Sequence, residues 1–172
     1  TMRVHSYEPD PRVTDSLEVR FNSLDDIHIH KTAVGESVGE VELFLGQKST
    51  ELTTAIPMSK SDYTATKTRV TTLDKESDRH NFSQIDLLKI DVEGYESAVL
   101  KGASSLLEKE KINCIQFEYG RNWRRAGATL YSVVERLRGF GFSVYLLRPR
   151  SLRKVNFEGV GEYFSYSNYI AI

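Results

Sequence analysis

The sequence is poor in cysteine and in long apolar runs. Its one cysteine, Cys114, excludes both an internal disulfide framework and a zinc site built from cysteines. No apolar run approaches the length needed to cross a bilayer, so we expect no transmembrane segment. Both features are typical of proteins of the reducing cytoplasm, which is the location we expect. The 172 residues suffice for a single domain with a substantial core.

Two motifs that would assign a function directly are also missing. No Gly-x-Gly-x-x-Gly sequence follows a strand and opens a helix, so a nicotinamide-binding domain loses most of its support. The four histidines show no metal-ligand spacing with the cysteine. His28 and His30 share one face of an expected strand and offer two metal ligands. We favour the simpler interpretation that both histidines belong to an ordinary half-exposed strand. We therefore predict no metal site.

Basic residues are concentrated in one part of a nearly neutral chain. From Arg121 to Lys154, nine basic residues stand against one acidic residue, which gives this segment a charge of +8 and leaves −9 for the remainder. Such asymmetry favours an anionic acceptor, and Trp123 among the arginines offers a ring that could stack on a sugar. A solvated surface with one packed tryptophan explains the same residues equally well. No nucleic-acid-binding motif accompanies the arginines, so we expect no nucleic-acid partner.

Strand and helix patterns alternate along the chain. We expect strands at 3–7, 27–34, 40–45, 68–73, 86–91, 111–119, 142–147 and 163–172, and helices at 11–22, 95–108 and 130–139. This alternation predicts an α/β fold with a mainly parallel sheet that is covered on both faces. Residues 46–67 are rich in Ser and Thr and poor in core residues. They predict a flexible insertion, either a binding flap or a plain surface loop.

The most informative stretch spans residues 86–96. Its first half is nearly all apolar and predicts a buried strand, and Gly94 allows a sharp turn into a helix. Asp91 and Glu93 stand at the carboxyl end of this strand, where open α/β sheets bind ligands. A buried carboxylate without a partner is costly, so a functional role is favoured for Asp91. Glu96, early in the helix, is better explained by its interaction with the helix N-terminus.

Several segments match a known family in the family's order. They are Tyr7-Glu-Pro-Asp-Pro11, Thr32-Ala-Val-Gly35 with Gly39-Glu-Val-Glu-Leu43, Val70-Thr-Thr-Leu-Asp74, Leu87-Leu-Lys-Ile-Asp-Val-Glu-Gly-Tyr-Glu96 with Gly102-Ala103, Ile115-Gln-Phe-Glu118, and Asn168-Tyr-Ile-Ala-Ile172. With these segments the chain resembles the FkbM family of S-adenosylmethionine-dependent methyltransferases. The string Lys-Ile-Asp-Val-Glu-Gly-Tyr-Glu is highly specific, whereas the Glu-Pro and Leu-Asp pieces are weak taken singly. The resemblance implies a Rossmann-like methyltransferase fold in three layers, and methyl transfer to a hydroxyl of a sugar, glycolipid or natural product.

The resemblance also implies roles for individual residues. Glu8, followed by Pro9, would accept hydrogen bonds from the ribose hydroxyls of S-adenosylmethionine, because two vicinal hydroxyls need an acceptor with two oxygens. Ala33 and Val34 would line the adenine pocket. Three strand-end carboxylates would face the transferring methyl group and the acceptor hydroxyl, the first of them also contacting the cofactor: Asp91, Glu93 and Glu118.

Direct displacement at the methyl carbon asks the protein to align the acceptor oxygen and to remove its proton. A carboxylate whose pKa is raised by burial or by a neighbouring carboxylate is a suitable base. Asp91 is the first candidate for this role and Glu118 the second. In a less favoured alternative, the same carboxylates hold a divalent cation that acidifies the hydroxyl.

One part of the family pattern is missing from the sequence. The family's first strand and glycine-rich loop, which receive the methionine end of the cofactor, would precede Arg3. In the family's sheet that strand lies between the strands expected at 3–7 and 86–91, which would otherwise leave backbone groups unpaired. We therefore expect an N-terminally incomplete domain that lacks the first strand and helix, with the strand supplied by the same longer chain. The alternative is a catalytically inactive relative that binds a sugar or a partner protein.

Overall fold

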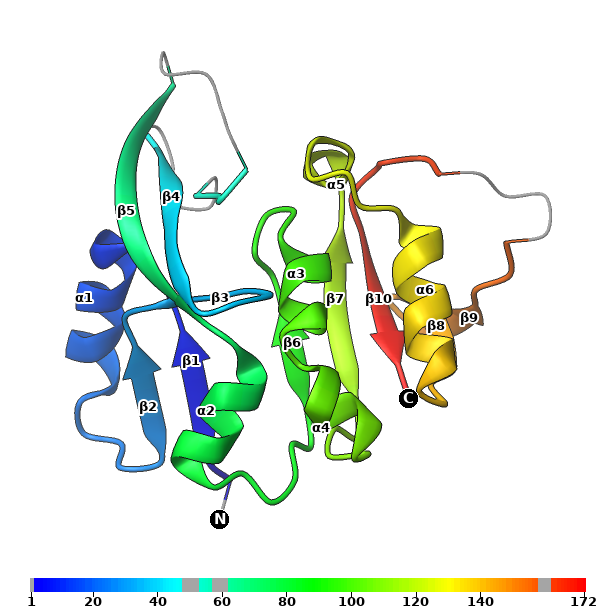
Figure 1. The fold of residues 1–172 in the computed structure, drawn as a ribbon, viewed down its shortest axis with the longest axis horizontal. Coiled ribbons are helices and arrows are strands. Elements are labelled where there is room, and N and C mark those ends of the chain that lie inside the picture. The colour runs from blue at the N-terminus through cyan, green and yellow to red at the C-terminus, as the bar shows by residue number, and fades with distance from the viewer. Residues whose placement is uncertain (1, 48–52, 57–61, 158–161) are drawn as a thin grey trace.

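The computed structural model describes residues 2–47, 53–56, 62–157 and 162–172. Strands and helices alternate through most of this length (Figure 1). In chain order they are β1 (Val4–Tyr7), α1 (Pro11–Phe21), β2 (Ile27–His30), β3 (Ala33–Val34), β4 (Gly39–Gly46), β5 (Tyr63–Thr71), α2 (Leu73–His80), β6 (Leu88–Ile90), α3 (Glu96–Lys101), α4 (Ser104–Glu108), β7 (Ile115–Tyr119), α5 (Arg121–Arg125), α6 (Leu130–Gly139), β8 (Val144–Arg148), β9 (Ser151–Lys154) and β10 (Ser167–Ala171). Among the described residues no helix has the length and apolar character that crossing a membrane requires.

The described strands form three sheets rather than one. A two-stranded sheet pairs β1 with β2, a five-stranded sheet has the order β6-β7-β10-β8-β9, and a three-stranded sheet has the order β3-β5-β4. Strands β1, β2 and β7 point toward the top of Figure 1, and β6 is parallel to β7. The carboxyl ends of the parallel strands therefore lie at the same end of the molecule, with β4 and β5 rising beyond them.

The prediction of a mainly parallel sheet is wrong, because the strands pair in both parallel and antiparallel directions. Strands β1 and β2, β3 and β5, and β6 and β7 pair in parallel, whereas β4 and β5, β7 and β10, β8 and β10, and β8 and β9 are antiparallel. The reason lies in the connections. Parallel neighbours need a crossover, usually a helix, while a short turn reverses the chain. No helix separates β8, β9 and β10 among the described residues, and β8 turns directly into β9.

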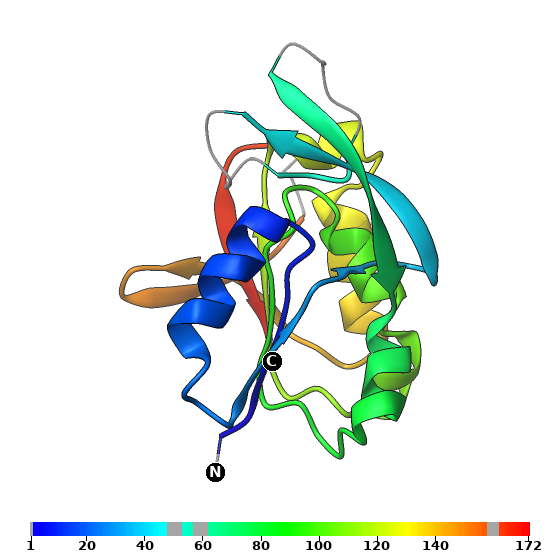
Figure 2. The same ribbon diagram turned by 90° about the vertical axis from the view of Figure 1, so that its left-hand side faces the viewer.

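The helices lie on both sides of the strands. Figure 2 shows α1 on one side, and α2, α3, α4 and α6 on the other. The α6 side carries most of the core, because apolar residues recur along this helix at helical spacing and face the sheet. Large apolar side chains of α3, α4, α6 and strand β7 are almost fully buried in this core: Leu100, Leu107, Ile115, Phe117, Val134 and Leu137.

Polar side chains begin three of the helices. Asp10 precedes α1 and accepts a hydrogen bond from the backbone N–H of Arg12. Thr72 and Thr129 do the same for α2 and α6 through the N–H groups of Lys75 and Ser132. Such caps satisfy backbone donors that the first turn leaves unpaired. Helix α2 was missed by the sequence analysis, although Thr72 followed by acidic residues is a signal that predicts a helix start.

Part of the segment 46–67, which the sequence predicted as a flexible insertion, takes part in strand pairing. Residues 48–52 and 57–61 lie outside the described residues. The backbone N–H groups of Thr54 and of Phe44 in β4 each donate to the carbonyl of the other residue. Thr54 and Ile56 are both buried. Strand β5 begins at Tyr63, so its pairing with β4 extends further than the sequence indicated.

Two strand edges face the same region of the molecule. In the described part of the chain, β1 pairs only with β2, and β6 is the end strand of the five-stranded sheet. Residues of β1 and residues of β6 both line one large cavity. The strands expected at 3–7 and 86–91 are therefore not hydrogen-bonded to each other among the described residues.

Candidate active site

A cavity of about 1710 Å³ opens between β1 and β6 and runs along both strands to their carboxyl ends. All the site residues predicted from the sequence line it: Glu8, Pro9, Ala33, Val34, Asp91, Glu93 and Glu118. They come from β3 and from the ends of β1, β6 and β7. Strand ends of an α/β sheet meet at one edge, so residues far apart in sequence reach the same cavity.

Glu8 follows β1 at the rim of this cavity. Its backbone N–H donates to the carbonyl of His30, which continues the pairing of β1 with β2. Its Oε1 accepts from the N–H of Asp10 at 2.8 Å. Burial raises the pKa of this carboxyl above its usual range. The side chain is therefore held in a fixed, half-buried position, from which it can accept hydrogen bonds.

Three carboxylates gather at the ends of β6 and β7. One oxygen of each of Asp91, Glu93 and Glu118 lies within 4.8 Å of the others. Besides burial, the charges of Asp91 and Glu93 contribute to the raised pKa of Glu118. Carboxylate oxygens gathered in this way are also ligands suited to Mg²⁺ or Mn²⁺.

The backbone between β6 and α3 holds Glu93 in place. Glu93 has a positive φ of 51°, which is uncommon outside glycine. Its carbonyl accepts from Thr54 Oγ1 at 2.9 Å, and its Oε2 accepts from Asn122 Nδ2 at 3.4 Å. Gly94 follows with φ of 105°, and a Cβ there would lie 2.6 Å from Asn122 Cβ. Only glycine fits at this position.

Glu96 supports the same turn from inside the protein. It is fully buried, and its Oε1 accepts from the N–H groups of Val92 at 3.0 Å and Gly94 at 3.3 Å. Burial raises the pKa of Glu96 to about 7. The sequence assigned Glu96 to the helix start, and its contacts agree with a structural role in holding this turn.

Asp91 and Glu118 differ in their surroundings. Asp91 Oδ2 lies 2.8 Å from Lys89 Nζ, and its side chain is 43% exposed. Glu118 is half-buried. Burial, followed by the charges of Asp91 and Glu93, raises the pKa of Glu118 from 4.5 to about 7. A carboxylate with this pKa can exchange a proton with a ligand at neutral pH.

The arginine-rich segment does not form one surface at the site. Arg121 alone among its basic residues lines the cavity. Arg136 donates to Ser104, and Arg138 donates to Glu135 and to the carbonyl of Val155. Trp123 is 1% exposed and packs against Phe117 and Tyr119. This agrees with the interpretation of Trp123 as a packed side chain rather than a ring that stacks on a sugar.

Two polar partners at the site were missed by the sequence analysis. Asn122 and Thr54 hold Glu93, but they come from α5 and from the segment expected as a flexible insertion. No local pattern marks either residue as part of a site. Their contact with Glu93 depends on how distant segments pack.

Fold and site together define an α/β domain with a ligand cavity at the carboxyl ends of parallel strands. The family model described as Methyltransferase FkbM domain matches residues 1–144, so the chain belongs to the FkbM methyltransferase family. This confirms the resemblance found in the sequence.

A solved structure has a similar fold. It is the methyltransferase FkbM from Methylobacillus flagellatus KT, with a TM-score of 0.59 and 16% sequence identity. The alignment covers 99% of this chain and 36% of that one, so this chain spans about a third of the length of that protein. None of the curated proteins matches the sequence.

The raised pKa of Glu118 predicts a specific pH dependence of stability. Between about pH 4.5 and pH 7 the folded state keeps a proton that the unfolded state has released, so this group lowers stability as pH rises. We expect Glu118→Gln to raise the melting temperature relative to wild type, with a gap that widens from about pH 5 to pH 8. Melting curves of the full polypeptide across this range measure it.

The exposed Glu108, at the end of α4, provides the matched control. Glu108→Gln should follow the wild-type curve at every pH. A Glu118→Gln effect that stays constant from pH 5 to pH 8 would show that burial does not shift the pKa of Glu118.

Proposed function

We propose that this domain belongs to an S-adenosylmethionine-dependent O-methyltransferase that acts on a hydroxyl of a sugar, glycolipid or natural product. The observation that carries the proposal is that all the strand-end carboxylates of the resemblance line a single cavity, together with Ala33 and Val34. Family membership supports methyl transfer, and the carboxylates support an acceptor that must lose a proton.

The residues of the cavity fit the proposed cofactor. Glu8 is held at the rim and offers carboxylate oxygens to vicinal ribose hydroxyls. Ala33 and Val34 offer small apolar side chains to an adenine ring, and Pro9 borders the same region. When bound, S-adenosylmethionine supplies a methyl group activated by a sulfonium centre.

Glu118 is the better candidate for the general base. Its pKa of about 7 allows it to be ionised at neutral pH and to accept the proton of an acceptor hydroxyl. Asp91, placed first by the sequence, is more exposed and paired with Lys89, which stabilises its charge. We assign Asp91 and Glu93 to positioning the reacting groups. The negative charge of the three groups makes a divalent cation a possible further ligand.

The acceptor is a small molecule or carbohydrate. Arg121 lines the cavity, and its planar guanidinium suits a phosphate or carboxylate on the acceptor. An anionic acceptor is therefore favoured over a neutral one.

The direct test is transfer of a labelled methyl group from S-adenosylmethionine to hydroxylated acceptors by the full polypeptide. We expect Glu118→Gln to lower kcat by roughly 10²–10⁴-fold, the usual contribution of a general base. The wild-type kcat should rise with pH to a plateau above about pH 7, because the base must be ionised.

Glu108→Gln serves as the control and should keep the wild-type kcat. Binding of the cofactor without transfer to any sugar, glycolipid or natural product tested would favour the inactive, ligand-binding alternative.

A second measurement tests the role of Glu8. Loss of a charged hydrogen-bond acceptor costs about 1.5–3 kcal/mol, so Glu8→Gln should weaken S-adenosylmethionine binding by roughly tenfold or more. Calorimetric titration of the full polypeptide measures the affinity. Glu18→Gln removes an exposed ion pair on α1 and should leave the affinity unchanged. Equal affinities for Glu8→Gln and wild type would place the ribose elsewhere.

A strand from the polypeptide that precedes Thr1 is the proposed occupant of the space between β1 and β6. Both strands have an edge without a neighbouring strand among the described residues, and both line the cavity. Backbone N–H and C=O groups at such edges favour a pairing partner. With one strand added, β2, β1, the added strand, β6 and β7 would form a continuous parallel run, as in a Rossmann-like methyltransferase.

Hydrogen exchange of the full polypeptide tests this pairing. The amides of β1 and β6 should exchange as slowly as those of β7, roughly tenfold or more slowly than those of β9. Strand β9 is an end strand of its sheet and provides the reference for an open edge. A preceding segment should show the same protection. Exchange in β1 and β6 as fast as in β9 would exclude an added strand.

A further inference from the structure

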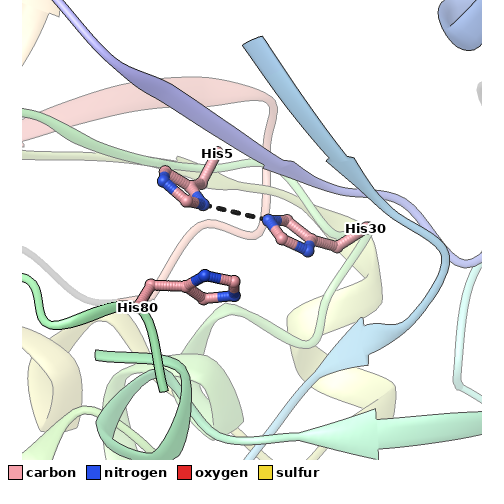
Figure 3. Close-up of side chains that lie close together, drawn as sticks. All are labelled: His5, His30 and His80. Carbon is pink, nitrogen blue, oxygen red and sulfur yellow. Dashed lines mark hydrogen bonds between the residues drawn. The ribbon is translucent and has the colours of Figure 1, made fainter. Parts of the chain in front are cut away.

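Three histidines from separate elements meet beside the β1–β2 sheet (Figure 3). His5 lies on β1, His30 on β2 and His80 at the end of α2. A ring nitrogen from each lies within 4.8 Å of the other two. His5 Nδ1 and His30 Nε2 are 3.0 Å apart. Three imidazole nitrogens around a common point are the arrangement found in zinc sites with three histidine ligands.

Contacts within the cluster account for its ring faces and for two of its nitrogen atoms, because His5 Nδ1 and His30 Nε2 form a hydrogen bond with each other (Figure 3). The His5 ring stacks on His30, and the His30 ring stacks on Tyr7. His5 Nε2 and His80 Nε2 are nevertheless buried without a hydrogen-bond partner among the described residues. An unpaired buried polar atom is costly, and proteins of known structure contain few of them. Neither atom is the one that faces a neighbouring histidine or that would be a ligand here: His5 turns Nδ1 to His30, and His80 turns Nε2 toward Glu76.

A buried carboxylate stands next to the histidines. Glu76, in α2, is 3% exposed and accepts hydrogen bonds from Tyr7 and Thr71. Its Oε2 lies 3.3 Å from His80 Nε2, although the two are not aligned for a hydrogen bond. Histidines that bind metals commonly have a carboxylate beside the ring nitrogen that is not a ligand. Glu76 is placed to orient the His80 ring in this way.

We propose that His5, His30 and His80 bind a divalent transition metal, with Zn²⁺ as the ion that suits three neutral imidazoles and no sulfur ligand. Tetrahedral zinc with ligand bonds of about 2.0–2.1 Å places its nitrogens roughly 3.3 Å apart. The His5–His30 pair is already near this spacing. The His80 nitrogen lies within 4.8 Å of the other two and would have to move closer for all three to bind one ion.

The ionisation of the cluster is compatible with metal binding. Burial, followed by the charges of neighbouring histidines, lowers the pKa of His5 to about 4, and burial also lowers the pKa of His30. Both rings are therefore neutral at pH 7, which is the form that binds a metal.

The metal would join the β1–β2 sheet to α2, which follows it in the chain only after β3, β4 and β5. Its role is structural, because it would fix the strand that precedes Glu8 against α2. The three carboxylates at the ends of β6 and β7 form a separate group with separate ligands.

The test is calorimetric titration of the full polypeptide with ZnCl₂ after removal of metal by EDTA. We expect one equivalent of Zn²⁺ to bind and to raise the melting temperature. His5→Gln, His30→Gln and His80→Gln should each weaken binding by at least about tenfold, since each removes a ligand. Co²⁺ in place of Zn²⁺ should give the intense visible absorption of a tetrahedral site, and this absorption should be lost in the same variants.

His28→Gln is the matched control, because His28 is the fourth histidine and lies on β2 beside the cluster without belonging to it. It should bind Zn²⁺ like the wild type. If His30→Gln does not fold, His80→Gln at the end of α2 carries the same test. Zn²⁺ binding that survives all three substitutions, or that is lost in Asp91→Asn instead, would overturn the proposal. These outcomes do not depend on methyl transfer.

Discussion

The open edges of β1 and β6 are the constraint on which the rest of the structure depends. Among the described residues each strand has hydrogen-bonding partners on one side only, and the cavity between them is lined by every site residue that the sequence predicted. Backbone groups at a sheet edge favour a pairing partner. The two open edges and the predicted site residues therefore border the same space, so the proposed added strand and the proposed ligand would be neighbours.

The segments that carry the family resemblance divide into two physical classes. Asp74 accepts from the N–H groups of Ser105 and Leu106, so it fixes the start of α4. Gly102 is needed because a Cβ there would overlap the carbonyl oxygen of Gly35. These residues hold elements together and do not line the cavity. Glu8, Asp91, Glu93 and Glu118 line it, and their carboxylates remain accessible to a ligand because none of them is fully buried.

The sequence predicted the parts of the fold that depend on local pattern. The strand before Asp91 and the helices that begin at Pro11 and Leu130 follow from residues close together in the chain. The position of β10 between β7 and β8, and its antiparallel direction, depend on pairing between distant segments. The histidine cluster joins residues 5, 30 and 80, so no spacing rule reveals it. The metal signals in the sequence were the pair His28 and His30 on one strand and the carboxylates at the strand ends.

The unequal surroundings of the three carboxylates give them different tasks. A cluster of like charges cannot be fully ionised at low cost, so the proton goes to the member that water and cations reach least. Lys89 stabilises the charge of Asp91, and Asn122 donates to Glu93. Glu118 is half-buried at the end of β7, and burial is the first cause of its raised pKa. The packing of β7 against its neighbours therefore raises the pKa of Glu118. Residue type alone does not reveal this packing, so the sequence analysis ranked Asp91 ahead of Glu118 as the base.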